Sequence, residues 1–217
     1  IPDSLADTAY VACALIAGLP ASVFKRGEWL PGIADGSLRV AVGHPVNPWV
    51  ADAGHADLLL LAHDDEVHAV PRSQVDVHHL TSLDASRRLA QVNWQPSAAT
   101  LVAEGELGRT LWVHTLSRGA LSVAGQLLGL AQRMLDLSVD YTAQRKQFGK
   151  PIGSFQAVKH HLADVATQLE FAKPVLYRAA YALAQGQSTA HVWVSQARLA
   201  CCEAAWLAAR HGIQVHG

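Results

Sequence analysis

A long, nearly unbroken helical repeat restricts the fold of this chain more than any other feature. From Leu111 to Gly217, apolar or small side chains recur in alternating steps of three and four, which keeps one face of a helix apolar over many turns. Short breaks at Gly149–Gly153 and at Gly186 interrupt the pattern. Because short connections make neighbouring helices antiparallel, the pattern predicts three long helices in an up-and-down bundle.

In each predicted helix, one set of positions forms the apolar stripe that we expect to face the bundle interior. The first stripe is Leu116, Ala120, Val123, Leu127, Leu130, Met134, Leu137 and Tyr141. The second stripe is Phe155, Val158, Leu162, Val165, Leu169, Ala172, Leu176, Ala179 and Leu183. The third stripe is Val192, Leu199, Cys202, Trp206, Ala209 and Ile213.

The residues before the bundle divide into a helical start and a strand-rich middle. The run Ala56–Ala62, apolar except for Asp57, and nearby alternating segments predict strands, with a turn at Asp64-Asp65. We therefore predict an α+β, mainly helical fold. Its parts are the remnant of an N-terminal helical domain in 1–35, a middle antiparallel β-domain in 36–104, and a C-terminal helical bundle in 105–217 whose last helices are missing.

Charge and hydropathy exclude two classes of partner. The formal net charge of −1 leaves no basic excess to neutralise nucleic-acid phosphates. The apolar run Ala9–Leu19 is too short to span a bilayer and lacks the basic start of a signal peptide. The three cysteines show no CxxC spacing, which favours reduced thiols in a cytoplasmic protein.

The histidines do not form a recognisable metal motif. The chain has 12 of them, and the adjacent pairs His78-His79 and His160-His161 face apart on a strand or diverge on a helix. No HExxH motif occurs, and no GxGxxG or Walker-type loop is present. We expect no metal site and no Rossmann-type nucleotide site.

The segment Arg145–Ile152, with the sequence R-K-Q-F-G-K-P-I, joins the first two predicted helices. Cations at a helix C-terminus suit the negative end of the helix dipole, and Arg145 can also fork onto a phosphate or pyrophosphate. Gln147 and Phe148 can contact a heterocycle or ribose. On composition alone, a basic turn that merely joins two helices is the favoured interpretation.

The same string closely resembles the signature of the acyl-CoA dehydrogenase family at this helix junction. Further segments match that family in the same order, namely Gly129–Gln132, Leu169–Ala172 and Gln214–Gly217. The last of these looks like the start of the family's Q-x-x-G-G turn. The resemblance is specific from Leu111 to Gly217 and looser from Trp29 to Trp94.

The resemblance implies FAD at a subunit interface in a dimer of dimers, within an acyl-CoA dehydrogenase-like fold. The counterpart of Arg145 reaches the pyrophosphate of a neighbouring subunit's FAD, while those of Gln147 and Phe148 contact its adenosine side. Counterparts of Gln214 and Gly217 help to hold the same end. In the family, a glutamate removes the α-proton of an acyl-CoA thioester while the β-hydrogen leaves as hydride to the flavin.

The sequence departs from the family pattern at two places that matter for catalysis. Most members carry the base beyond the Q-x-x-G-G turn, where this sequence stops, and the alternative position on the first bundle helix is Gly119. The glycine- and serine-rich loop that meets the flavin ring is replaced by Val42–Ala51, which contains two prolines. We therefore expect no catalytic residue in this chain. For His44 and Trp49, packing within the loop is favoured over a flavin contact.

The favoured hypothesis is FAD-dependent α,β-dehydrogenation of an acyl-CoA by a heteromer. In it, this subunit lacks its own base and completes the FAD site of a homologous partner, as in some family members of steroid side-chain breakdown. One alternative is a self-sufficient homomer with its base beyond residue 217, and another is a flavin monooxygenase of the same fold.

For Glu170, pairing with a nearby cation is favoured over a role as base.

Overall fold

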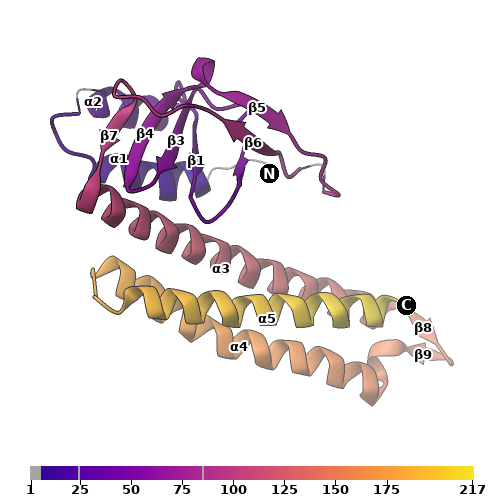
Figure 1. Cartoon of the computed structure of the whole chain (residues 1–217). Helices are drawn as coiled ribbons and strands as arrows, with labels where there is room; N and C mark the ends of the chain where they lie inside the picture. The colour runs from indigo at the N-terminus through magenta and orange to yellow at the C-terminus, as the bar shows by residue number, and fades with distance from the viewer. Residues whose placement is uncertain (1–5, 24, 85) are drawn as a thin grey trace. The chain divides into compact units, whose positions relative to one another are not determined.

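The structure is a computed structural model that describes residues 6–23, 25–84 and 86–217. It forms two compact units, residues 1–119 and 120–217. Strands and short helices make up most of the first unit, and long helices make up the second (Figure 1). The predicted α+β, mainly helical fold is confirmed.

The strands of the first unit form two sheets. One has the order β1-β3-β4-β7, with bounds Val40–Gly43, Leu58–His63, Glu66–Pro71 and Leu101–Ala103. The other has the order β2-β6-β5, with bounds Trp49–Ala51, Leu89–Asn93 and Asp76–His79. β1 pairs with β3 in parallel, and the other pairings within these sheets are antiparallel. The predicted turn at Asp64-Asp65 is confirmed, because it joins β3 to β4.

The four leucines of the run predicted as a strand are buried on both faces of β3. Leu58 and Leu60 of β3 lie in a core with the helices of this unit. Leu59 and Leu61 lie in a second core with residues of the β2-β6-β5 sheet. Because successive side chains of a strand point to opposite faces, a strand between two cores is apolar at every position.

Helices cover the first of these cores. They are the π-helix η1 (Asp7–Ala12), α1 (Cys13–Gly18), α2 (Arg26–Ala34) and the first turns of α3 (Gly105–Gln144). A Cβ at Gly108 would lie 1.9 Å from the carbonyl oxygen of Asp65, so only glycine lets α3 begin against the β3–β4 turn. In the described part of the chain, no helix has the length and hydropathy that a membrane crossing requires.

The second unit confirms the three predicted long helices. The remainder of α3 is followed by the strands β8 (Lys146–Gln147) and β9 (Lys150–Pro151) and a 3-10 turn (Ile152–Ser154). α4 (Gln156–Ala184) and α5 (Ala190–His216) complete the unit (Figure 1). Their shared core includes Leu128 of α3, Leu169 of α4 and Cys201 of α5.

The predicted stripe of α4 is largely confirmed, that of α3 is confirmed only in part, and that of α5 is wrong. Leu127 and Met134 of the predicted α3 stripe pack against the shared core. The buried positions of α3 in this unit include Leu121, Ala124, Leu128 and Ala131, and those of α5 are mainly Val194, Ala197, Cys201, Ala204 and Ala208. Side chains of the predicted stripes are exposed instead, among them Leu130, Leu137, Leu199 (62%), Trp206 (66%) and Ile213 (74%). Small residues fill the interior because they let helix axes approach closely, and both faces are apolar enough for periodicity to favour the wrong one.

Candidate functional site

The hairpin between α3 and α4 holds an aromatic residue in a strained backbone conformation. β8 and β9 are joined by the two residues Phe148 and Gly149, whose φ angles are +54° and +80°. Two successive left-handed residues match the geometry of a type I′ hairpin turn, which asparagine and glycine adopt readily. A phenylalanine in this conformation costs about 1–2 kcal/mol. Its side chain is also 90% exposed, so burial does not offset the strain.

Backbone contacts fix this hairpin against the end of α3. The Ile152 N–H donates to the carbonyl oxygen of Arg145 at 2.8 Å, and the Arg145 N–H donates to that of Tyr141 at 2.9 Å. A Cβ at Gly153 would lie 3.1 Å from the Thr142 carbonyl oxygen, so the chain returns closely along α3. Backbone contacts near Arg145 and Ile152 therefore hold the hairpin in place.

The hairpin presents several positive charges to solvent. Arg145, Lys146 and Lys150 are all exposed. The Lys150 ammonium lies 4.4 Å from the centre of the Phe155 ring, which in turn meets the Phe148 ring edge to face at 6.1 Å. Within residues 6–23, 25–84 and 86–217, the Arg145 guanidinium has no hydrogen-bond or ion-pair partner. The Arg145 guanidinium, on a backbone held by hydrogen bonds, is therefore free to bind an anion.

The second predicted segment lies at the end of α5 and contacts the end of α3. Gln214 and Gly217 are exposed there, and Gly217 has a φ of +113°. The His216 ring stacks on the Tyr141 ring at 4.2 Å, and the Tyr141 hydroxyl donates to the His216 carbonyl oxygen at 3.4 Å. The link between the two segments thus runs through Tyr141 and His216, which the sequence alone did not single out as site residues. The histidine within the string Q-V-H-G was the sequence feature that could have indicated His216 as a site residue.

A depression of about 500 Å³ adjoins the hairpin within the second unit. Its lining residues are Val139, Thr142, Ala143, Pro151, Gly153, Lys159 and Leu162. Apolar side chains dominate this lining, and Lys159 adds a cation. Such a surface suits a ligand that combines an apolar ring with negative charge.

The loop Val42–Ala51 is held by the packing of His44, as predicted. The His44 Nδ1 accepts from the Val46 N–H at 3.2 Å, so its Nε2–H donates to the Trp112 carbonyl oxygen at 3.1 Å. The two rings also meet edge to face at 5.5 Å. Burial lowers the pKa of His44, which favours this neutral form. The side chain of Trp49, by contrast, is half exposed.

The remaining candidates for acid–base chemistry are already paired or missing. The carboxylate of Glu170 accepts from the Lys173 ammonium one turn away on α4, which confirms its predicted pairing with a cation. Gly119, which the resemblance places at the alternative base position, offers no ionisable group. Of the adjacent histidines, His78 has its Nε2 2.9 Å from the Asp76 carboxylate.

The comparison with known families decides the assignment. The model of the acyl-CoA dehydrogenase C-terminal domain matches residues 107–217, about half of the chain. The chain belongs to the acyl-CoA dehydrogenase family. The matched region contains the hairpin, the depression beside it and the end of α5 described above.

Individual relatives extend the likeness over nearly all of this chain. The "Acyl-CoA dehydrogenase IpdE2" of Mycobacterium tuberculosis is 30% identical over all of this chain, which spans 61% of that relative's length. An acyl-CoA dehydrogenase structure from Geobacillus kaustophilus superposes with a TM-score of 0.86 at 22% identity, over 98% of this chain and 67% of that one. "PigA with FAD and proline" superposes with a TM-score of 0.83 at 18% identity, over 98% of this chain and 67% of that one.

Proposed function

We propose that this chain is a subunit of an FAD-dependent acyl-CoA dehydrogenase, and that its α3–α4 hairpin binds the pyrophosphate and adenosine end of FAD shared with a second subunit. In this proposal the second subunit is a homologous acyl-CoA dehydrogenase chain in a dimer of dimers. The reaction is the α,β-dehydrogenation of an acyl-CoA thioester. The free thiols of Cys13, Cys201 and Cys202 agree with a cytoplasmic location.

The observation that carries the proposal is the combination of strain, exposure and unpaired charge in one hairpin. Phe148 is 90% exposed with a φ of +54°, and Arg145 beside it has no partner among the described residues. Strained backbone and exposed aromatic rings are unfavourable in a mere connector and are concentrated at ligand-binding sites. A planar aromatic ring next to a guanidinium fits a nucleoside diphosphate, which offers a flat base and adjacent negative charge.

The residues present fit this part of FAD. Arg145 would pair with the pyrophosphate, while Gln147 and Phe148 would contact the adenosine side. Gln214 and Gly217 would hold the same end from α5, which the Tyr141–His216 contact keeps beside the end of α3. Bound FAD supplies the hydride acceptor for the reaction. The chain's own contribution is to bind and orient it.

The first unit supports the heteromeric form of the proposal. Catalytic members approach the flavin ring with a glycine-rich loop, whereas Val42–Ala51 holds Pro45 and Pro48 and is tied to Trp112 through His44. Gly119 provides no base. This subunit would therefore complete a partner's site rather than run its own. A self-sufficient homomer with a base beyond residue 217 is the alternative within the family.

A second candidate function rests on a structure of the same fold. PigA was solved with FAD and proline, so this fold also accommodates a flavoprotein whose bound substrate is not an acyl-CoA. A flavin monooxygenase would consume oxygen in the presence of an external reductase. An acyl-CoA dehydrogenase would instead lose its flavin absorbance on addition of an acyl-CoA under anaerobic conditions.

The test is flavin content with and without a homologous subunit. We expect the chain purified alone to carry little flavin, and the complex co-expressed with a homologous, glycine-loop-containing subunit to be yellow. In that complex, Arg145→Ala should raise the Kd for FAD by roughly tenfold to a hundredfold, because a charge-assisted hydrogen bond contributes about 1.5–3 kcal/mol. Arg133→Ala, at an exposed position of α3, is the matched control and should leave the Kd unchanged.

Two results would decide against parts of this proposal. If Arg145→Ala binds FAD as tightly as the unaltered complex, the hairpin is not the flavin half-site. If the chain alone binds one FAD and turns over an acyl-CoA, it forms a homomer with a complete site and the heteromeric form is wrong.

A further inference from the structure

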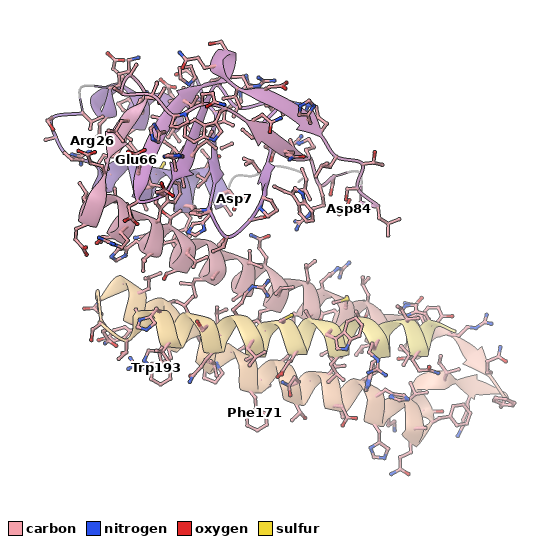
Figure 2. All side chains as sticks on the ribbon, in the orientation of Figure 1. Asp7, Arg26, Glu66, Asp84, Phe171 and Trp193 are labelled. Atoms are coloured by element: carbon pink, nitrogen blue, oxygen red, sulfur yellow. The ribbon has the colours of Figure 1, made fainter. Side chains whose placement is uncertain are left out.

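The turn between β3 and β4 gathers three potential metal ligands within the first unit. His63 ends β3, and Glu66 and His68 lie on β4, with His63 paired opposite Glu66 in the sheet register. Their ligand atoms all lie within 4.8 Å of one another. Glu66 is marked on its strand in Figure 2. The three residues come from the described part of the first unit alone.

The carboxylate of Glu66 lies at the centre of this cluster. Its Oε2 lies 2.9 Å from His68 Nε2 and 3.2 Å from His63 Nδ1. Atoms bound tetrahedrally to Zn²⁺ at about 2.1 Å lie roughly 3.4 Å apart, so both separations would lengthen by a few tenths of an ångström on binding the ion.

The surroundings fix the position of the ligands. His68 is only 2% exposed, and its Nδ1 lies 2.9 Å from Thr100 Oγ1. Its ring packs against Trp94 at 5.0 Å. The Trp112 indole N–H donates to the Glu66 carbonyl oxygen at 2.9 Å, which anchors the backbone of β4. Outer hydrogen bonds of this kind orient the histidine ligands of metal sites.

One tautomer of His68 leaves Nε2 free to bind a metal ion. Thr100 Oγ1 lies 3.0 Å from the Ser97 carbonyl oxygen and 2.9 Å from His68 Nδ1. In the tautomer whose Nδ1–H donates to Thr100 Oγ1, Nε2 carries a lone pair beside the Glu66 carboxylate, which lies 2.9 Å away. A metal ion between the two atoms would be bound by both.

We propose that His63 Nδ1, Glu66 Oε2 and His68 Nε2 form a binding site for a borderline transition-metal ion of the Zn²⁺ class. Two imidazoles and one carboxylate suit Zn²⁺, Co²⁺ or Ni²⁺ rather than Mg²⁺ or Ca²⁺, which prefer sets made up of oxygen ligands. The half-exposed His63 side of the cluster leaves a coordination position open to water. The ion would clamp the β3–β4 hairpin, and this role does not depend on the flavin proposal.

The sequence offered little sign of this site. The ligands are not adjacent histidines but residues spaced by three and two positions around a turn. Only the β3–β4 register brings them together. The prediction of no metal site considered His78-His79 and His160-His161, and neither pair belongs to this cluster.

Isothermal titration of the EDTA-treated, untagged protein with Zn²⁺ tests the proposal. We expect one Zn²⁺ per chain. His63→Ala and Glu66→Gln should each raise the Kd by at least about tenfold. His78→Ala removes an exposed histidine that also pairs with a carboxylate, and it should bind Zn²⁺ like the unaltered protein. Co²⁺ in place of Zn²⁺ should give the visible absorption of a low-coordinate site, which the first two variants lose.

Circular dichroism in EDTA separates loss of ligands from loss of fold. Both ligand variants change side chains that are at least partly exposed, and their spectra should match that of the unaltered protein. If no stoichiometric binding occurs, or if His63→Ala and Glu66→Gln bind Zn²⁺ as tightly as His78→Ala does, the cluster is a hydrogen-bonded network without a metal and the proposal is wrong.

Discussion

At the scale of single residues, Phe148 shows where sequence and structure give different information. The string around Arg145 and Gln147 indicated a nucleotide-binding junction by its resemblance to a family. The string could not indicate that Phe148 would adopt a left-handed conformation, because a backbone angle depends on the register of β8 and β9. Strain in an exposed residue is therefore information that the structure adds.

Phe148→Asn should separate stability from ligand binding. Asparagine before Gly149 suits a type I′ turn, so we expect the free energy of unfolding to rise by up to about 1 kcal/mol. The same change removes the exposed ring, so the Kd of the assembled complex for FAD should rise. Urea unfolding and flavin titration measure the two effects. Phe171→Asn, at an exposed site on α4, is the control for flavin binding (Figure 2). Unchanged affinity in Phe148→Asn would leave its strain without a functional explanation.

His44 should make the stability of the protein depend on pH. Burial lowers its pKa in the folded state, whereas the unfolded state keeps a value of about 6.5. As the pH falls through that value, the unfolded state binds more protons, so the contribution of His44 to stability is present above it and is lost below it. His44→Gln cannot titrate, so it should lose less unfolding free energy than the unaltered protein between about pH 7 and pH 5. Chemical denaturation at a series of pH values measures both proteins. Equal losses of unfolding free energy in His44→Gln and in the unaltered protein would contradict this prediction.

At the scale of elements, the sequence predicted that the long helices exist, but it did not predict which face of each helix is buried. The steps of three and four indicated all three long helices. In α5, however, the large residues Leu199, Trp206 and Ile213 point outwards, while an alanine-rich face is buried. When both faces are apolar, the choice depends on how closely the helices pack, which a single sequence does not show. Likewise, Glu66 and His68 approach His63 only through the pairing of β4 with β3.

Two leucine substitutions test this orientation. Leu169 is buried in the core of the second unit, so Leu169→Ala should reduce the free energy of unfolding by about 2–5 kcal/mol. Leu199 belongs to the exposed side of α5, and Leu199→Ala should change the stability of the isolated chain by less than about 0.5 kcal/mol. Both are measured by urea unfolding of the chain without a partner. If both variants lose a similar amount of unfolding free energy, the predicted stripe of α5, and not the observed one, faces the core.

At the scale of the whole molecule, composition and periodicity predicted the fold class, and the resemblance predicted the family. The likeness was specific in the same region that the family model matches, residues 107–217. The chain spans 61% of the length of the M. tuberculosis relative. The proposed FAD titrations use the co-expressed complex, because the proposed flavin site is shared between two subunits.

The stacked rings of Tyr141 and His216 have a thermodynamic consequence for the ligand. They join two segments that lie 75 positions apart along the chain, and they do so within the fold of one subunit. The conformational entropy of bringing those segments together is therefore lost during folding rather than on association. A dinucleotide arriving between subunits would meet a preorganised surface, and more of its contact energy would remain as affinity.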